Sequence, residues 1–157
     1  MNREINKDEF WKQRLEEAGE NIRLSVYTCP EEDWEIINQK HKEVIQKLVS
    51  GKVLDVGCGY GRLSNWFQDY TGIDGSQTFI KKAQELYPNK KFLYVDVSRG
   101  TLFSEKEFDW AVCISLKAIV IRELGEDVWK SILKELKRIA KKVLILEYSY
   151  LDDYELL

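Results

Sequence analysis

The sequence has few of the residues that build metal centres and disulfide frameworks. Its 157 residues include one histidine and three cysteines, Cys29, Cys58 and Cys113, and no two cysteines form a Cys-x-x-Cys pair. A zinc site built from cysteine and histidine is therefore not expected. We predict that all three thiols are reduced and serve as small packing groups.

Long apolar runs are also missing. None approaches the roughly 20 residues that cross a bilayer, so we expect no membrane association. The first residues, MNREINKDEFWKQRLEEAG, are charged throughout and lack the apolar region of a secretory signal, which predicts a cytoplasmic protein. The net charge of −3 argues against a protein that coats nucleic acid, because such proteins are basic.

What is present is the composition of a globular protein, with 44% hydrophobic and 32% charged residues. The length, and the absence of linkers or repeats, predict a single domain over residues 1–157. Apolar residues at three- and four-residue steps predict a helix between Pro30 and Gly51, after a shorter helix over Glu9–Ala18. Residues 1–50 are thus expected to form a helical cap on a core of residues 51–157.

From Gly51 onward, short apolar runs alternate with helical segments. The predicted strands are KVLDVG, YTGID, KFLYVDV, DWAVCISL and KKVLILEYSY. The predicted helices between them are RLSNWFQD, SQTFIKKAQELY and EDVWKSILKELKRIAKK, with a polar connector before the fourth strand. Strands that are apolar on both faces and alternate with helices indicate an α/β fold with a parallel sheet covered on both sides.

Three glycines follow the first predicted strand at alternate positions, Gly57, Gly59 and Gly61. Ligands of such sheets bind beyond the carboxyl ends of the strands, and glycines there allow the backbone to approach a ligand closely. The second strand ends in Asp74, where a carboxylate can accept hydrogen bonds from both hydroxyls of a ribose. Together these features predict a cofactor that contains adenosine.

Two details bear on which cofactor it is. A nicotinamide site has the pattern G-x-G-x-x-G, but Arg62 occupies the position of its third glycine. Asp55, just before the loop, would repel a pyrophosphate and would suit a ligand that carries an ammonium and a sulfonium. The carboxylate of that ligand is expected near the backbone amides of the loop and of the start of the following helix. Taken alone, each acid of the region could instead be a cap or turn residue.

The segment VLDVGCGYG followed by YTGID closely resembles the first two motifs of class I S-adenosylmethionine-dependent methyltransferases. The resemblance runs from Gly51 to Ser149 and includes KKFLYVDV as the third strand, EFDWAVCISL as the fourth, and LKELKRIAKKVLILE as the last helix and fifth strand. It implies a Rossmann-like three-layer sandwich with a mainly parallel sheet of about five strands in the order 3-2-1-4-5, and S-adenosyl-L-methionine as cofactor, released as S-adenosyl-L-homocysteine.

The resemblance also assigns roles to residues at the matching positions. The residues implied at the methionine end are Asp55, Gly57 and Gly59, with Gly61 shaping the loop. Asp74 would hold the ribose, Asp96 and Val97 would meet the adenine, and Ile114 and Ser115 would border the reacting methyl group. Tyr60 would cover the cofactor or attract the sulfonium through its ring, or else pack on a neighbouring helix.

The sequence departs from the family pattern after the fifth strand. Only LDDYELL follows KKVLILEYSY, with no room for the sixth and seventh strands of the family. The fifth strand would then be an exposed apolar edge, to be covered either by the C-terminal tail or by a second chain. We favour a homodimer through this edge.

The acceptor side carries no clear motif. The segment ISLKAIV lacks the Pro-Pro-aromatic signature of amino-methylating nucleic-acid enzymes. Cys113 follows Val112, whereas enzymes that attack the cytosine carbon have a Pro-Cys pair. A DNA base is therefore not expected as acceptor. Lys117 and Ala118 stand where many small-molecule enzymes of the family have an acid or histidine. No general base is evident.

His41 is the remaining candidate for a base, since it lies on the apolar stripe of the N-terminal helix, although a buried, hydrogen-bonded histidine would give the same pattern. Tyr27 could reach the methionine end of the cofactor. We predict methyl transfer to a small molecule or side chain by in-line displacement, which can proceed by positioning alone. The alternative is a non-catalytic module that binds S-adenosylmethionine or S-adenosylhomocysteine and acts as an accessory subunit or sensor. A nicotinamide enzyme is disfavoured by Arg62 and Asp55.

Overall fold

The computed structural model describes residues 7–26, 30–147 and 154–157. The N-terminal elements are α1 (Lys7–Ala18), the 3-10 helix η1 (Ile22–Ser25) and α2 (Glu31–Leu48). The elements of the core are β1 (Val53–Val56), η2 (Ser64–Trp66), β2 (Tyr70–Asp74), α3 (Gln77–Leu86), β3 (Lys91–Tyr94), η3 (Val97–Arg99), β4 (Phe108–Ile114), α4 (Leu116–Leu124), α5 (Glu126–Ile139), β5 (Ala140–Leu146) and β6 (Tyr154–Leu156).

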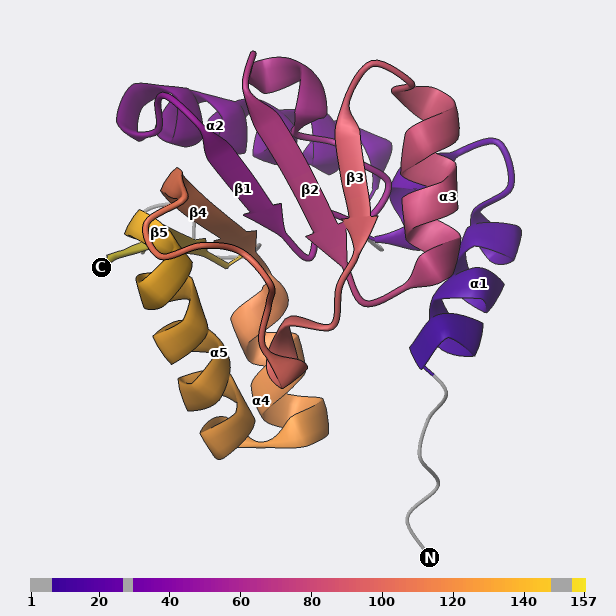
Figure 1. Cartoon of the computed structure of the whole chain (residues 1–157). Coiled ribbons are helices and arrows are strands. Elements are labelled where there is room, and N and C mark those ends of the chain that lie inside the picture. The colour runs from indigo at the N-terminus through magenta and orange to yellow at the C-terminus, as the bar shows by residue number, and fades with distance from the viewer. Residues whose placement is uncertain (1–6, 27–29, 148–153) are drawn as a thin grey trace, which may run out of the picture.

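The strands form one six-stranded sheet in the order β3-β2-β1-β4-β5-β6 (Figure 1). The first five strands run parallel, and only β6 is antiparallel to its neighbour. The order of the first five is the one the sequence predicted, and the α/β, Rossmann-like fold is confirmed. The order reverses at β1, because β2 lies on one side of it and β4 on the other, so the carboxyl end of β1 is where such folds bind ligands.

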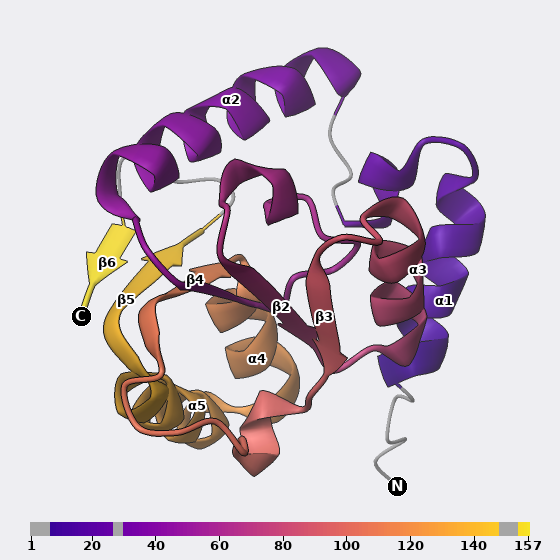
Figure 2. The same cartoon turned by 45° about the horizontal axis from the view of Figure 1, so that its top comes forward.

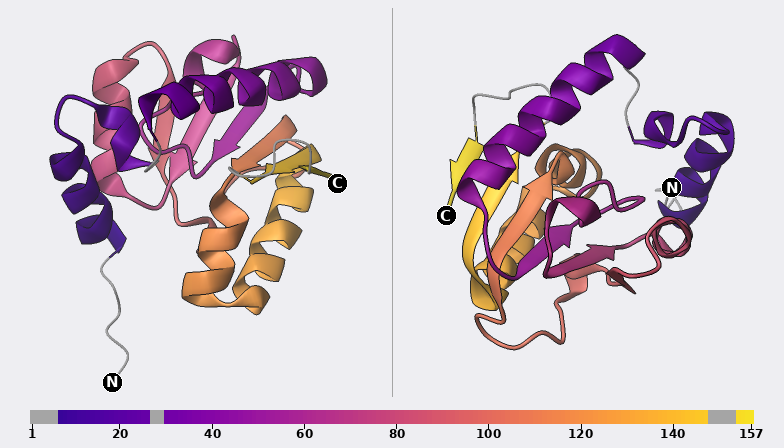
Figure 3. Two further views of the ribbon diagram at one scale, coloured as in Figure 1. Left: turned by 180° about the vertical axis from the view of Figure 1, so that it is seen from behind. Right: turned by 90° about the horizontal axis from the view of Figure 1, so that it is seen from above.

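Helices cover both faces of the sheet, as Figures 2 and 3 show from three directions. One face packs on α5 through an apolar stripe of Trp129, Ile132, Leu136 and Ile139. The other face packs on α2 and α3 through residues that include Ile45, Val49, Ile80 and Ala83. Strand residues in the middle of this sandwich are buried on both sides, which explains why their sequence is continuously apolar rather than alternating.

The N-terminal helices pack against different parts of the core. Helix α2 lies across one face of the sheet, whereas α1 lies outside α3, where the ring of Trp11 contacts that of Phe79 at 5.2 Å between centroids. The expected helical cap therefore includes one helix of the sandwich itself. Nowhere in residues 7–26, 30–147 or 154–157 is there a helix long and apolar enough to cross a membrane.

Strand β6 covers the edge that the sequence left exposed. It pairs with β5 from Leu144, opposite Leu156, to Leu146, opposite Tyr154, and the backbone of Leu157 exchanges two hydrogen bonds with Val143. Of the two ways to protect the edge, the structure therefore has the C-terminal tail in place. The sheet has one strand more than the five expected, and the homodimer stays a prediction.

Two segments differ from the predicted pattern. The stretch RLSNWFQD forms only the short helix η2, and α4 follows the fourth predicted strand, where no helix was expected. Ser115 adopts a left-handed conformation, with φ of 57°, and this turn ends β4 before Leu116. Because LKAIVIREL is apolar on several faces, its periodicity does not distinguish a helix from a buried strand.

Candidate functional site

The glycine loop lies directly after β1, and its three glycines all have positive φ, at 73° for Gly57, 53° for Gly59 and 86° for Gly61. A side chain is strained at such φ values. The spaces beside the glycines differ. A Cβ on Gly61 would lie 2.6 Å from the ring of Phe92, so this glycine is required by core packing. A Cβ on Gly57 would lie 3.2 Å from the side chain of Leu116.

The backbone amides of the loop are hydrogen-bonded within the fold. Those of Gly57 and Cys58 both donate to the carbonyl of Ile73, at 2.9 and 3.0 Å, and that of Gly59 donates to Asp74 Oδ2 at 2.9 Å. These amides are therefore not an open cradle for an anion. The expectation that the cofactor's carboxylate lies near the amides of the loop and of the following helix start stays a prediction, and the bonds of Gly57, Cys58 and Gly59 argue against a pyrophosphate there.

Asp74 connects the loop to the next helix. It ends β2, and besides the Gly59 amide it accepts a hydrogen bond from the Ser76 amide at 2.8 Å. Burial raises the pKa of its carboxyl group to about 6, although both backbone donors favour the charged form. A carboxylate can accept about four hydrogen bonds, so two of its acceptor sites remain for a ligand.

Asp55 lies in β1 beneath the loop and is buried. The hydroxyl of Tyr70 donates to its Oδ2 at 2.7 Å, and both groups are removed from solvent. Burial raises the pKa of Asp55 to about 6, despite the opposing effects of the Tyr70 hydroxyl and the Arg62 guanidinium. Two neighbouring strands thus carry acids that ionise less readily than usual, and a cation placed beside them would favour their charged forms.

The adenine end predicted from the sequence is built around η3. Asp96 caps this helix, because its Oδ1 accepts from the Ser98 amide at 3.1 Å and from the Ser98 hydroxyl at 2.5 Å. Its Oδ2 lies 3.4 Å from Arg99 Nε. Asp96 is therefore a cap residue in this structure, as its pattern alone allowed, and it is still partly exposed at the tip of the sheet.

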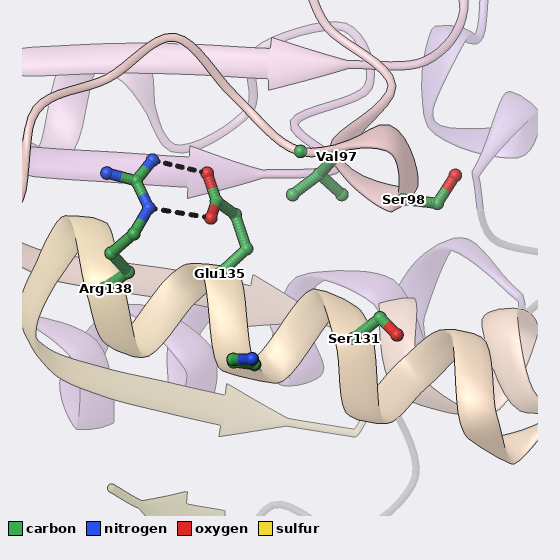
Figure 4. A pocket seen from close by; sticks show the side chains of 7 residues that line it. Val97, Ser98, Ser131, Glu135 and Arg138 are labelled. Carbon is green, nitrogen blue, oxygen red and sulfur yellow. Dashed lines mark hydrogen bonds and ion pairs between the residues drawn. The ribbon is translucent and has the colours of Figure 1, made fainter.

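A hollow of about 370 Å³ lies between η3 and α5 (Figure 4), lined by Val97, Ser98, Gly100, Ser131, Lys134, Glu135 and Arg138. Arg138 donates two hydrogen bonds to Glu135, at 2.6 and 2.9 Å, and Thr101 donates to the same carboxylate. These contacts hold the pKa of Glu135 at about 2. Glu135 and Arg138 on this wall are therefore already paired with each other, and the hollow lies on the α5 side of η3.

Comparisons with known proteins agree with the site. Residues 53–142, more than half of the chain, match the family model described as a methyltransferase domain. This chain belongs to the class I methyltransferase family. It is 30% identical over 87 residues to protein 235L of Invertebrate iridescent virus 6, whose name describes a methyltransferase, and the match covers 51% of this chain and 32% of the viral protein.

Solved structures of similar fold include protein PH0226 of Pyrococcus horikoshii OT3, with a TM-score of 0.61 and 26% identity over 74% of this chain and 58% of that one. Phosphoethanolamine N-methyltransferase 1 of Haemonchus contortus, in complex with phosphoethanolamine and S-adenosylhomocysteine, has a TM-score of 0.68 at 19% identity, covering 92% of this chain and 33% of that one. The methyltransferase chain thus spans from about a third to just over half of these relatives' length.

His41 belongs to α2 and is fully buried. Its Nδ1 lies 3.3 Å from a guanidinium nitrogen of Arg62, which also donates to Asn38 at 2.6 Å. Burial first, and then the Arg62 charge, lower the pKa of the imidazole to about 3, so it is a weak base at neutral pH. The geometry favours the packing role of His41 over the catalytic one.

The other candidates lie around the loop. The side chain of Tyr60 is buried, which favours packing over a role as cofactor cover, and Ile114 is partly buried against the α2 face of the sheet. Ser115 occupies the turn between β4 and α4, and its Oγ is buried with no hydrogen-bond partner in the described part of the chain. Tyr27 and Cys29 lie outside the described residues, while Cys58 and Cys113 are free, buried thiols.

One residue of this edge was missed by the sequence analysis. Glu147 directly follows β5 at the carboxyl end of the sheet, beyond the partners Ile114 and Leu146. An acid immediately after a buried apolar strand is the same signal that singled out Asp74. It was missed because the predicted strand ran on through EYSY, which made Glu147 an ordinary strand position.

Proposed function

We propose that this chain catalyses S-adenosylmethionine-dependent methyl transfer to a small molecule or a side chain by in-line displacement. The observation that carries the proposal is the pair of acids with raised pKa, Asp55 and Asp74, at the carboxyl ends of two adjacent strands beside the glycine loop. When bound, the cofactor supplies a methyl group made electrophilic by a cationic sulfur. The residues fit a cationic ligand, because both acids gain a counter-charge and the loop offers no free anion cradle in Gly57–Gly59.

Each residue contributes in a defined way. Asp74 has two acceptor sites left for the hydroxyls of a ribose, and its backbone bonds hold it in place. Asp55 offers negative charge from below the loop, with its orientation fixed by Tyr70. Fixed groups of this kind lower a barrier by positioning, which is sufficient where the leaving group is already good.

The alternative is a module that binds the cofactor without catalysis. It is supported by Leu116, whose side chain lies at the tip of β4 against Gly57, where an acceptor would have to approach.

Buried free thiols at Cys58 and Cys113 are typical of a reducing compartment, which supports our proposal that the protein is cytoplasmic.

Calorimetric titration of the protein with S-adenosylmethionine, and separately with S-adenosylhomocysteine, tests the proposal. Binding of either supports the cofactor, and S-adenosylhomocysteine formed during incubation with candidate acceptors then separates the enzyme from the binding module. Absence of binding to both would refute the cofactor assignment.

A further inference from the structure

The tips of β1, β4 and β5 lie next to one another at the carboxyl edge of the sheet. The register pairs Val56 with Cys113 and Cys113 with Ile145, so the residues that follow these strands form one row. Adjacent strands are about 4.8 Å apart, which places Glu147 roughly 10 Å from the glycine loop, with Ser115 between them. This is the dimension of a small molecule that reaches from the loop across the tip of β4.

Glu147 is unusual among the acids of this edge. It is partly buried, and its Oε1 is inaccessible and has no hydrogen-bond partner in the described residues. Burial raises the pKa of the Glu147 carboxyl group. The Ala118 amide, in the first turn of α4, and the Lys117 charge oppose this effect, and the Glu155 charge adds to it. An inaccessible carboxylate oxygen without a donor is costly, and a ligand that supplies a donor removes that cost.

The charges around Glu147 indicate the kind of donor. Lys117 is the basic residue next to it, and its ammonium is paired with Glu155 of β6. The Ser115 hydroxyl can donate or accept, so it selects no charge. Among the described residues Glu147, Glu155 and Lys117, two carboxylates therefore share one ammonium, and the excess negative charge attracts a cation or a strong hydrogen-bond donor and repels an acidic acceptor.

We propose that Glu147 binds an amino group of the methyl acceptor, so that this methyltransferase acts on amines rather than on acids. The proposal rests on the proposed function, because it requires the cofactor beside the glycine loop. Glu147 would act as a binding and specificity residue, held in place by the start of α4.

Sinefungin tests this without knowledge of the acceptor. It has the skeleton of S-adenosylhomocysteine, but a carbon that carries an amino group replaces the sulfur, so it presents an amine where the methyl group would be. Calorimetry gives the dissociation constants of sinefungin and S-adenosylhomocysteine for the native protein, Glu147→Gln and Glu85→Gln. Glutamine keeps an oxygen facing the Ala118 amide and removes only the charge, so a role limited to capping α4 leaves the ratio unchanged. Glu85→Gln is the matched control, because it removes one exposed acid near the end of α3 and leaves Lys117 paired with Glu155.

We expect Glu147→Gln to lower the preference for sinefungin over S-adenosylhomocysteine at least threefold, with S-adenosylhomocysteine affinity and melting temperature close to native. Glu85→Gln should leave the preference unchanged. An unchanged ratio in Glu147→Gln, with both ligands bound, overturns the role of Glu147 while the proposed function stands. An equal drop in both variants also overturns it, because the effect is then one of general charge. If the native protein binds neither ligand, the proposed function fails and this inference fails with it.

Discussion

Cofactor affinity should increase with pH between 5 and 7. Asp55 and Asp74 both have their pKa raised from 3.8 to about 6, mainly by burial, so near pH 5 both carboxyls are largely protonated in the free protein. A ligand that carries an ammonium and a sulfonium binds the ionised forms more tightly. Binding at low pH must therefore first remove these protons, and that requirement disappears as the pH rises through about 6.

The size of the effect follows from the pKa values. Each pH unit below the pKa costs about tenfold in affinity for every acid that must ionise, so the loss from pH 7 to pH 5 is about tenfold for one acid and about a hundredfold for both. The free energy of unfolding of the free protein changes with pH in the opposite direction. A rise from 3.8 to about 6 favours folding at low pH, and about 3 kcal/mol per acid is lost as the pH rises through that interval.

The assay is calorimetric titration with S-adenosylmethionine at pH 5, 6 and 7 at constant ionic strength. Asp55→Asn and Asp74→Asn should bind more weakly at pH 7 and should each have a flatter profile, because one titrating group is removed. Asp127→Asn, at an exposed position at the start of α5, should leave the profile as it is. Affinity that does not change between pH 5 and pH 7 would refute the idea that these two acids recognise the cation.

Three further changes test the fold around the site. Tyr70→Phe removes the 2.7 Å hydrogen bond to Asp55, so it should cost about 1.5–3 kcal/mol in urea denaturation at pH 7, and less at pH 4, where the acid is protonated. Gly61→Ala should lower the free energy of unfolding by about 1–3 kcal/mol more than Gly100→Ala, since both positions have positive φ but only Gly61 faces the Phe92 ring; equal losses would contradict this. Deletion of residues 154–157 should expose the edge of β5 and produce dimers or aggregates in light scattering, whereas a stable monomer would show that β6 is dispensable.

Much of the fold and of the cofactor side could be predicted because local signals agree there. The run VLDVG is a buried strand ending at glycines that need positive φ, and Asp74 ends the next strand in register with it. These features depend on residues close in sequence and on the general geometry of parallel sheets. The strand order was implied by the resemblance to class I methyltransferases.

Other features depend on contacts that no local pattern reveals. Helix α4 follows Ser115, whose left-handed conformation is unusual for serine and could not be predicted from the sequence. Strand β6 forms because residues 154–157 pair with β5, a contact that their own sequence does not predict. The state of His41 depends on Arg62, which is 21 positions away in sequence. Burial and pairing across the fold decide whether a residue is a reactive group or a packing group.

The glycine motif itself shows how structural and functional demands are divided. Gly61 is fixed by Phe92, Gly57 makes room for Leu116, and the amide of Gly59 holds Asp74. All three therefore have reasons that lie within the fold, and a protein could keep them after losing its ligand. The buried charge of Asp55 is different, since a neutral acceptor could take the hydrogen bond of Tyr70 without the cost of ionising a carboxyl out of water. A buried carboxyl that is kept despite this cost indicates a cationic ligand. The pH dependence of binding therefore distinguishes a site that binds the cofactor from a fold that has only kept the motif.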